Sequence, residues 1–293
     1  MQFSLNKATL LLLRLPFSFF LMPIFILTLS QSGSIDRLHT LITFLVIHLL
    51  VYPASNGYNS FVDRDEGPIG GLEKPPVPTR QLFYLTLIMD IISTGLSFLF
   101  VTPIFSMAVF IYIMASRAYS SRLVRLKKYP IIGFLTVVVF QGAFTFFMCY
   151  VGINFSEFEF SRQHIWILFA CSFQIAGAYP LTQIYQHKED LADGVTTLSY
   201  KLGYTGTFIF TALMFALCNI FYYLYFKEIG KLNQFFILQL FFLPIVSYFG
   251  YWFVKVLRNK NEANFTNTMR MNTIASICMN VCFTVLCFIA FTT

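Results

Sequence analysis

The sequence predicts an all-α protein, a polytopic transmembrane helix bundle of about nine membrane-spanning helices with a central cavity that faces the cytoplasm. Of its 293 residues, 57% are hydrophobic and only 11% are charged, whereas a soluble domain carries about 25% charged residues. The mean hydropathy is +0.69. Apolar runs of about 20 residues recur along the whole chain, and each is long enough to cross a bilayer core roughly 30 Å thick.

Nine segments have the length and apolar composition of a membrane-spanning helix. In chain order they are 8–30, 38–56, 82–100, 102–119, 130–151, 163–185, 204–226, 234–257 and 270–291. The first is too long for the apolar core of a signal peptide, and no small-residue cleavage site follows it. No connection between the nine is long enough for a soluble domain, so residues 1–293 are expected to form a single membrane domain.

Lysine and arginine are distributed unequally between the two ends of the predicted spans. With nine spans, the N-terminus shares one side with the second, fourth, sixth and eighth connections, where most basic residues lie. The other side holds only Arg37, Arg162, Lys227 and Lys231. By the positive-inside rule we expect the N-terminus and its side of the bundle in the cytoplasm, and the C-terminus on the opposite side. The net charge of +7 therefore reports topology and not a nucleic-acid partner.

Acidic residues gather in two connections on the predicted cytoplasmic side. The first group is Asp63, Asp65, Glu66 and Glu73, and the second is Glu189, Asp190 and Asp193. An ordinary solvated loop is one interpretation of each group. However, both groups follow the end of an apolar span and lie close to turn-forming glycines. Acids at the mouth of a helix bundle indicate a cation site or a proton relay.

The spacing of polar side chains in both groups suits a cation bound by oxygen. Asn59 and Asp63 are four residues apart, so they share one helix face if the second span continues that far. Gln186 and Asp190 have the same spacing, and Asp193 shares their face if that helix continues. Mg²⁺ prefers such oxygens and commonly combines one or two carboxylates with substrate phosphate oxygens. No cluster of cysteine and histidine suggests zinc.

The connection at 116–130, SRAYSSRLVRLKKYP, contains five basic residues and no acid. Membrane topology alone explains such a loop as well as a functional role does. In the functional interpretation, Arg122, Arg125 or Lys127 contacts a phosphate group. More basic residues adjoin the acidic groups, namely Arg64, Lys74 and Lys188. These residues suit a divalent cation with a diphosphate at the mouth of the bundle, and the rest of such a ligand would lie among apolar helices. A prenyl diphosphate has both parts.

The first acidic group resembles the first aspartate motif of the UbiA superfamily of intramembrane prenyltransferases, written NxxxDxxxD. Its Asn, its first Asp and the Arg that often follows fall on Asn59, Asp63 and Arg64. The last Asp of the motif would be residue 67, which is Gly67, and Asp65 or Glu66 is the candidate to take its place. The segment 74–78, KPPVP, is similar to the Arg-Pro-x-Pro stretch of the family.

Two later segments extend the resemblance along the chain. The second motif, DxxxD with Gly, Thr-Leu and Leu-Gly after it, is matched at Asp190, Gly194, Thr197, Leu198, Leu202 and Gly203. Its leading Asp is replaced by Gln186, for which Glu189 and Asp193 are candidate substitutes. Tyr119-Ser120 and the RLK at 125–127 are similar to a loop that follows the fourth helix of the family. Each motif is weak alone, but three in order in matching connections are specific.

The resemblance implies that Mg²⁺ bridges a prenyl diphosphate to the two acidic segments, with Asp63 and Asp190 as catalytic carboxylates. It implies as metal ligands Asn59, Asp63, Asp65, Glu66, Gln186, Asp190 and Asp193, and as diphosphate-binding residues Arg64, Lys74, Arg122, Arg125, Lys127 and Lys188. The prenyl group then passes to a small hydrophobic acceptor, an aromatic compound or a quinone precursor. Besides these ligands and the lipid bilayer, no nucleic acid and no obligate protein partner is expected.

Three alternatives to this function stay open. One is a polytopic transporter, which would carry functional charges near the bilayer midplane. The others are a UbiA-like protein with a non-aromatic acceptor and a relative that has lost activity, because each acidic motif lacks one carboxylate at Gly67 and Gln186.

Three further residues are candidates for the substrate pocket, namely Tyr119, Asp90 and Arg14. Asp90 lies inside the third span, and an intramembrane acid is a functional candidate. A hydrogen bond between two helices is the alternative for this side chain. Arg14 lies inside the first span, where it either lines the cavity or extends to the cytoplasmic surface.

Overall fold

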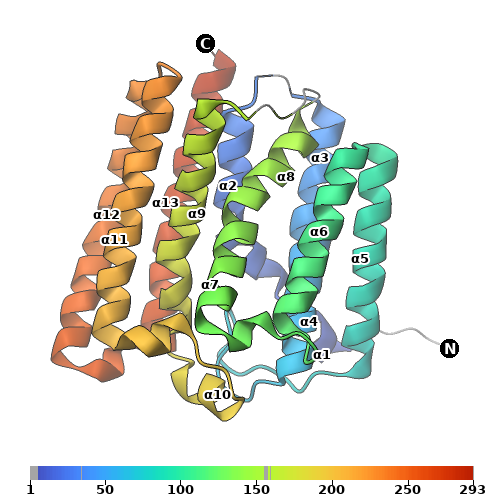
Figure 1. Cartoon of the computed structure of the whole chain (residues 1–293), viewed down its shortest axis with the longest axis vertical. Coiled ribbons are helices and arrows are strands. Elements are labelled where there is room, and N and C mark those ends of the chain that lie inside the picture. Colours follow the sequence, from blue (N-terminus) through green and yellow to red (C-terminus); the bar gives the residue numbers. More distant parts are fainter. Residues whose placement is uncertain (1–5, 34, 155–157, 159, 293) are drawn as a thin grey trace.

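The computed structural model describes residues 6–33, 35–154, 158 and 160–292, and it is a bundle of helices that run side by side (Figure 1). The α-helices are α1 (Lys7–Leu12), α2 (Ser18–Ser30), α3 (Arg37–Phe44), α4 (Tyr52–Asp63), α5 (Arg80–Phe100), α6 (Pro103–Ser120), α7 (Pro130–Val138), α8 (Phe144–Ile153), α9 (Arg162–Gln183), α10 (His187–Ala192), α11 (Leu198–Glu228), α12 (Leu232–Arg258) and α13 (Phe265–Thr292). Short 3₁₀ and π segments are η1 (Leu15–Phe17), η2 (Leu45–Val51), η3 (Leu126–Lys128), η4 (Val139–Ala143) and η5 (Lys260–Glu262).

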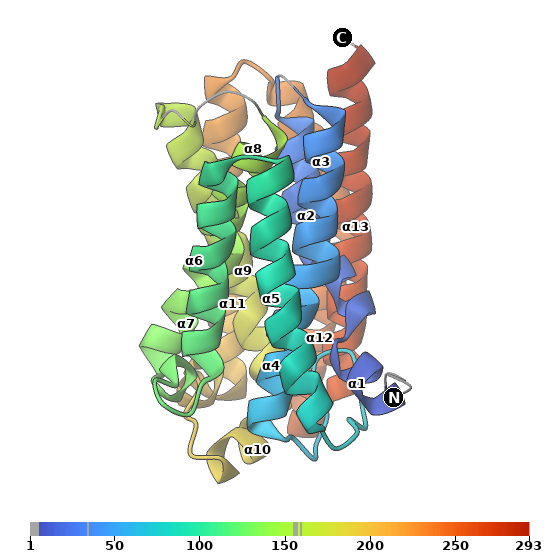
Figure 2. The same cartoon turned by 90° about the vertical axis from the view of Figure 1, so that its right-hand side faces the viewer.

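Within the described residues, eight helical stretches are long and apolar enough to cross a membrane. They are Lys7–Ser30, Arg37–Asp63, Arg80–Phe100, Pro130–Ile153, Arg162–Gln183, Leu198–Glu228, Leu232–Arg258 and Phe265–Thr292. The remaining predicted span, 102–119, forms α6, which runs along α5 in both views (Figures 1 and 2). Arg117 lowers the hydropathy of this helix, but the guanidinium is paired with Asp90 of α5. All nine predicted spans therefore form helices.

The first predicted span is not one continuous helix. It breaks after α1, where Arg14 takes a left-handed backbone conformation with φ of 49°, and the η1 turn follows before α2 begins. Pro16 contributes to the break because it has no N–H group to donate to the preceding turn. The break aims the side chain of Arg14 sideways into the bundle, where it donates to the carbonyl oxygens of Gly70 and Asn56.

Three hydrophobic clusters hold the bundle together. The largest joins α2, α9, α11, α12 and α13 around the fully buried side chains of Trp252, Tyr222 and Phe283. The second joins η2, α6 and α8 and includes Phe105 and Met148. The third is small and joins α1, α4 and α5. Burial of such side chains supplies the packing contacts of the bundle.

Two spans contain a π-helical turn in the middle of the membrane segment. One is η2, between α3 and α4, and the other is η4, between α7 and α8. Gly142 in η4 lies so close to α9 that an added Cβ would be 2.6 Å from the Cα of Ser172. A π turn widens the helix locally and often occurs at functional sites. Here it brings Gln141 to the wall of the central cavity.

One end of the bundle collects the ends of several helices. Helix α4 ends at Asp63, where Arg64 turns the chain with a left-handed φ of 55°. Helix α6 ends at Ser120, and the short helix α10 lies at this same end, with α1 beside it (Figures 1 and 2). The last turn of α13 lies at the opposite end. The acidic and basic connections singled out from the sequence therefore meet at one end of the bundle.

Candidate active site

A cavity of about 210 Å³ opens at this end of the bundle, and we call it the polar chamber. Eight of the residues predicted to form the site line it, namely Arg14, Asn59, Asp63, Asp65, Tyr119, Lys127, Gln186 and Asp190. Asp63 and Asp190 come from separate acidic segments, yet they share this one cavity. Helix α4 packs against α6, and η3 packs against α6 and α7, and this packing helps to bring these segments together.

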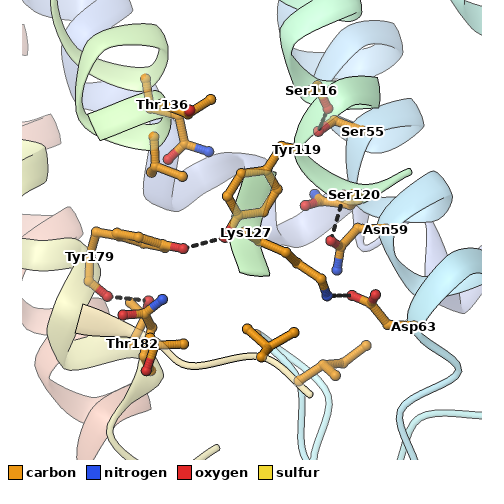
Figure 3. A pocket seen from close by; sticks show the side chains of 18 of the residues that line it. Ser55, Asn59, Asp63, Ser116, Tyr119, Ser120, Lys127, Thr136, Tyr179 and Thr182 are labelled. Atoms are coloured by element: carbon orange, nitrogen blue, oxygen red, sulfur yellow. Dashed lines mark hydrogen bonds and ion pairs between the residues drawn. The ribbon is translucent and has the colours of Figure 1, made fainter. Parts of the chain in front are cut away.

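The centre of the polar chamber is an ion pair between Asp63 and Lys127 (Figure 3). The Lys127 Nζ lies 2.5 Å from the Asp63 Oδ2, and the Asp63 side chain is only 4% exposed. The other carboxylate oxygen, Oδ1, has no hydrogen-bond partner within the described part of the chain. A buried, unpartnered carboxylate oxygen is costly, so it favours binding of a further cation or donor.

Asn59 is held on the wall of the chamber by α6. The Ser120 hydroxyl donates to the Asn59 Oδ1 at 2.7 Å, and one turn earlier the hydroxyls of Ser55 and Ser116 are 2.5 Å apart (Figure 3). These two contacts fix α4 against α6. The amide oxygen of Asn59 keeps a second lone pair, so the bond to Ser120 does not exclude binding of a cation.

The carboxyls of Asp65 and Asp190 are harder to ionise than exposed carboxyls. Burial raises the pKa of Asp190 to about 7, against the attraction of Lys127, and the neighbouring Asp65, Asp63 and Glu189 raise it further. Burial likewise raises the pKa of Asp65 to about 6, with Asp63 adding to the effect. Near neutral pH these two carboxyls therefore hold a proton more readily than exposed carboxyls do.

Two hydrogen-bonded tyrosines line the polar chamber. Tyr119 of α6 and Tyr179 of α9 are hydrogen-bonded to each other through their hydroxyls, and their rings lie along the cavity (Figure 3). Tyr179 was not among the residues predicted to form the site. Neither were the chamber-lining residues Asn56, Gln141 and Thr182. Their polarity within apolar spans is the one sequence signal that could have identified them.

A second cavity of about 250 Å³ adjoins the first, and we call it the apolar chamber. Aromatic and aliphatic side chains dominate its wall, among them Phe17, Phe20, Leu21, Phe215, Phe242 and Met279. Residues that line both chambers include Arg14, Tyr179 and Gln186. The guanidinium of Arg14 lies where the two cavities meet, and its Nε has no partner in the described part of the structure. A ligand with an anionic head and an apolar body fits this pair of chambers.

The loop 121–129 is joined to the residue that follows α10 by two ion pairs that share one carboxylate. Asp193 accepts from Arg122 at 2.8 Å and from Arg125, and Arg122 also donates to the Val62 carbonyl oxygen. Asp193 does not share a helix face with Asp190, because α10 ends at Ala192. Its carboxylate is occupied by two guanidinium groups and does not line the polar chamber.

Several other predicted site residues also lie outside the wall of the polar chamber. Exposed side chains that do not line it are Arg64, Glu66, Lys74 and Lys188. The reason is local: Arg64 and Glu66 follow the end of α4, where the chain turns outward, and Lys188 is on the outer face of α10. His187 is buried in the same helix and pairs with Ser199, so it does not reach the chamber.

The structure corrects the placement of Asp90. Its carboxylate accepts from the Nε of Arg117 at 2.8 Å, and the same guanidinium lies 3.9 Å from the ring centre of Tyr58. Asp90 lines a different cavity, between α5 and α6, and not the polar chamber. The alternative interpretation, a polar contact between two helices, describes this side chain.

The oxygen donors of the polar chamber bear on whether it fits a metal ion. Within the described residues, no three His, Cys, Asp or Glu side chains converge closely enough to hold a metal by themselves. However, the Asp63 Oδ1 on the wall of the chamber is a buried oxygen without a partner in that same part of the chain, and an ammonium group already neutralises the other oxygen of Asp63. Mg²⁺ takes few protein carboxylates when phosphate oxygens complete its shell. The donors fit a divalent cation that is held jointly with a phosphorylated ligand.

Solved structures with a similar fold include UbiA homologues. A UbiA homologue from Archaeoglobus fulgidus bound to DMAPP and Mg²⁺ has a TM-score of 0.71 and 16% identity, over 96% of this chain and 99% of that chain. The same homologue bound to GPP and Mg²⁺ gives the same values. A digeranylgeranylglyceryl phosphate synthase has a TM-score of 0.61 and 18% identity, over 98% of this chain and 99% of that chain.

Sequence comparison assigns the family independently of the fold. No curated protein matches this sequence. The model of the UbiA prenyltransferase family, however, matches residues 20–274, which include both acidic segments and the basic loop. The protein belongs to the UbiA prenyltransferase family.

Proposed function

We propose that this protein is an intramembrane prenyltransferase that moves a prenyl group from a prenyl diphosphate to a small hydrophobic acceptor, an aromatic compound or a quinone precursor. The observation that carries the proposal is the shared position of Asp63, Asp190 and Lys127 on one polar chamber, which adjoins an apolar chamber through Arg14. A diphosphate with a cation suits the first chamber, and a hydrocarbon chain suits the second.

The chain's own residues have separable roles in this proposal. Mg²⁺, when bound, would neutralise the charge that develops on the diphosphate oxygens as the allylic C–O bond breaks. Asp63, Asp190 and Asn59 are the residues that would hold the cation. Lys127 and Arg14 line the same chamber and are positioned to pair with the diphosphate. Asp65 and Gln186 complete the wall between them.

Aromatic side chains supply the rest of the chemistry. The rings of Tyr119 and Tyr179 line the polar chamber, where an allylic carbon next to the diphosphate would be placed. Aromatic faces attract a carbon that gains positive charge, and they exclude the water that would hydrolyse it. The acceptor then supplies the electron pair for the new bond and gives up a proton, which the diphosphate can take. The diphosphate leaves with the electron pair of the broken C–O bond.

The residues outside the chamber have a different role in the proposal. Arg122 and Arg125 hold the loop 121–129 in place through Asp193, and the exposed Arg64, Lys74 and Lys188 add positive charge around the mouth. Such charge attracts an anionic substrate to the mouth. With nine crossings and the basic connections inside, this mouth faces the cytoplasm and the C-terminus faces the other side.

A transporter is the second candidate function, and the position of the charges argues against it. The segments that carry the acids of the chamber, the end of α4 and the short helix α10, lie at one end of the bundle instead of near its middle (Figure 1). The intramembrane pair of Asp90 and Arg117 is satisfied internally, so it offers no free charge to a transported ion.

The test is a transfer assay with the full-length protein purified in detergent. Labelled prenyl diphosphates of several lengths are incubated with Mg²⁺ and a panel of aromatic and aliphatic acceptors, and both pyrophosphate and labelled lipid are measured. We expect both products to appear together and to require Mg²⁺. Uptake of prenyl diphosphate into vesicles without release of pyrophosphate would support the transporter instead.

A further inference from the structure

A groove runs between α5 and α6, which lie side by side at the edge of the bundle (Figures 1 and 2). Its volume is about 730 Å³, and we call it the lateral groove. No described residue that lines it also lines the polar or the apolar chamber. Exposed sides of membrane-spanning helices face lipid, so this groove opens to the bilayer. Aromatic and aliphatic side chains form most of its wall, among them Phe83, Leu87, Ile91, Phe98, Phe110 and Met114.

A charged pair lies in this mostly apolar wall. The Nε of Arg117 donates to the Oδ2 of Asp90 at 2.8 Å, and its Nη2 donates to the same oxygen. Both side chains line the lateral groove, with 17% of Arg117 and 11% of Asp90 exposed. Charged groups inside a membrane are costly, and they commonly mark a functional site. A hydrocarbon chain alone would need neither of them.

The pair leaves two hydrogen-bonding atoms without a partner. Both contacts between Asp90 and Arg117 end on Oδ2, and in the described part of the chain neither the Oδ1 of Asp90 nor the Nη1 of Arg117 has a hydrogen bond. Neither atom is fully buried, because the enclosed polar atoms that lack a partner do not include them. The wall of the lateral groove therefore offers one acceptor and one donor to a ligand.

The pair carries no net charge, and this determines which head group suits it. A phosphate would be attracted by Arg117, but it would be repelled by Asp90 and would lose its hydration in an apolar groove. A hydroxyl group is uncharged, and it can donate to a carboxylate and accept from a guanidinium. Hydrogen bonds to charged partners are stronger than those between neutral groups. The pair thus favours a hydroxyl over a phosphate.

Gly95 leaves room for the apolar body of such a ligand. It lies on α5 in the wall of the groove, and an added Cβ would meet no atom within 4 Å. The Ser106 hydroxyl of α6 donates to the Thr94 carbonyl oxygen at 3.0 Å, so the two helices are joined beside this glycine. From Asp90 to Phe98 the groove follows α5 for about 12 Å, with a rise of about 1.5 Å per residue. A hydrocarbon body of that length fits along it.

We propose that the lateral groove binds a neutral lipid alcohol, which is a membrane lipid with a single hydroxyl head and a hydrocarbon body. The hydroxyl pairs with Asp90 and Arg117, and the body lies along Gly95 toward Phe98. This site is separate from the polar and apolar chambers, and it does not depend on the proposed function. It also gives the intramembrane ion pair a role besides joining α5 to α6.

The test is photolabelling of the full-length protein in phosphatidylcholine nanodiscs. The probe is a long-chain alcohol that carries a diazirine, and mass spectrometry of peptides locates the label. We expect the label on α5 and α6, and an excess of the unlabelled alcohol should remove it. The methyl ether and the phosphate ester of that alcohol should compete about tenfold more weakly, because the ether cannot donate to Asp90 and the phosphate is repelled by it.

Two results of this competition would overturn the proposal. Equal competition by the methyl ether would mean that the groove holds any hydrocarbon chain. Stronger competition by the phosphate ester would mean that the groove binds an anionic head group instead of a neutral one.

Two glycine variants separate the groove from the rest of the lipid-facing surface. Gly95→Leu places a side chain in the groove where no atom obstructs its Cβ, and it should reduce labelling of α5 and α6 about tenfold. Gly250→Leu, on α12, is the matched control, because its added Cβ also meets no atom within 4 Å and it does not line the groove. Unchanged labelling in Gly95→Leu would overturn the proposed site.

A double variant tests the role of the charged pair. Asp90→Leu together with Arg117→Met removes both charges and leaves neither of them unpaired. Labelling by the alcohol should fall about tenfold, and the alcohol should then compete no better than its methyl ether. Labelling at the wild-type level would show that the pair does not recognise the hydroxyl, against the proposal. Gly95→Leu keeps the pair and gives an independent result if the double variant does not fold.

Discussion

The ammonium group of Lys127 lies 2.5 Å from one carboxylate oxygen of Asp63, and the other oxygen of that carboxylate is buried without a partner. Lys127 thus provides half of the positive charge that a divalent cation would bring to this position. The pair holds the buried Asp63 carboxylate in place before substrate arrives. Lys127 lines the chamber, so a diphosphate that enters it would contact the same ammonium group.

Substitution of Lys127 tests its role as a diphosphate ligand. Lys127→Gln should raise the KM for the prenyl diphosphate by about tenfold, because one charge-assisted hydrogen bond is worth roughly 1.5–3 kcal/mol. The measurement is initial rate against prenyl diphosphate concentration. Lys128→Gln removes the adjacent, exposed charge and should leave KM unchanged. An equal effect of both variants would mean that only the overall charge of the loop matters.

Asp193 is predicted to hold the loop 121–129 and not to bind metal. Asp193→Asn removes both of its pairs, with Arg122 and Arg125, and partly exposed ion pairs contribute at most about 1 kcal/mol each. Trypsin should then cleave within 121–129 about twofold to fivefold faster. Glu228→Gln, an exposed acid at the opposite end of the bundle, is the control. Unchanged cleavage together with loss of Mn²⁺ binding would show that Asp193 is a metal ligand after all.

The raised pKa of Asp190 predicts how stability depends on pH. Its folded pKa of about 7 is above the ordinary value, so the folded state holds a proton that the unfolded chain releases. The stabilisation is complete below about pH 4 and is lost as the pH rises through 7. His187, whose pKa burial lowers to about 4, acts in the opposite direction at acidic pH.

The comparison is therefore between wild type and Asp190→Asn, by thermal denaturation in detergent with a chelator present. Between pH 5.5 and 8 the wild type should lose several degrees of melting temperature relative to the variant, and Mg²⁺ with pyrophosphate should reverse that loss. Parallel curves for the two proteins would contradict the assignment of the raised pKa to Asp190.

The apolar chamber is predicted to hold the prenyl chain. Ala178 of α9 lines it, and Ala178→Leu adds three carbon atoms to a cavity of about 250 Å³. Overpacking of this kind costs roughly 1–3 kcal/mol. Transfer from long prenyl diphosphates should fall about tenfold, whereas transfer from dimethylallyl diphosphate should change little. Ala212→Leu, on the exposed face of α11, is the control, and an equal loss for all chain lengths would place the chain elsewhere.

The sequence was sufficient for the spans and for the two acidic segments, because hydropathy and spacing are properties of a single segment. It predicted that Asn59 and Asp63 share a face and that Gln186 and Asp190 do so, and all four line the polar chamber. It did not reveal the break at Arg14 or the π turn that contains Gln141. Both are local changes of backbone conformation inside apolar segments, and hydropathy does not distinguish them from a regular helix.

Contacts between segments were the least predictable feature. The pairing of Asp193 with two arginines, the pairing of Asp90 with Arg117, and the contact between Gly67 and Glu189 each join residues that are distant in sequence. Spacing within one segment carries no information on which side chain of another segment lies opposite. Arg14, Arg64 and Arg125, the non-glycine residues found with positive φ, all lie near the chamber, and this strain also appears only in the folded structure.

The most direct test of the central claim is prenyl transfer by Asp63→Asn and by Asp190→Asn, each compared with wild type in detergent. Each substitution keeps the shape of the side chain and removes the charge that would hold the cation. Both variants should bind Mn²⁺ with pyrophosphate more weakly and should lose transfer by about a hundredfold or more. Transfer at the wild-type rate in both variants would contradict the account.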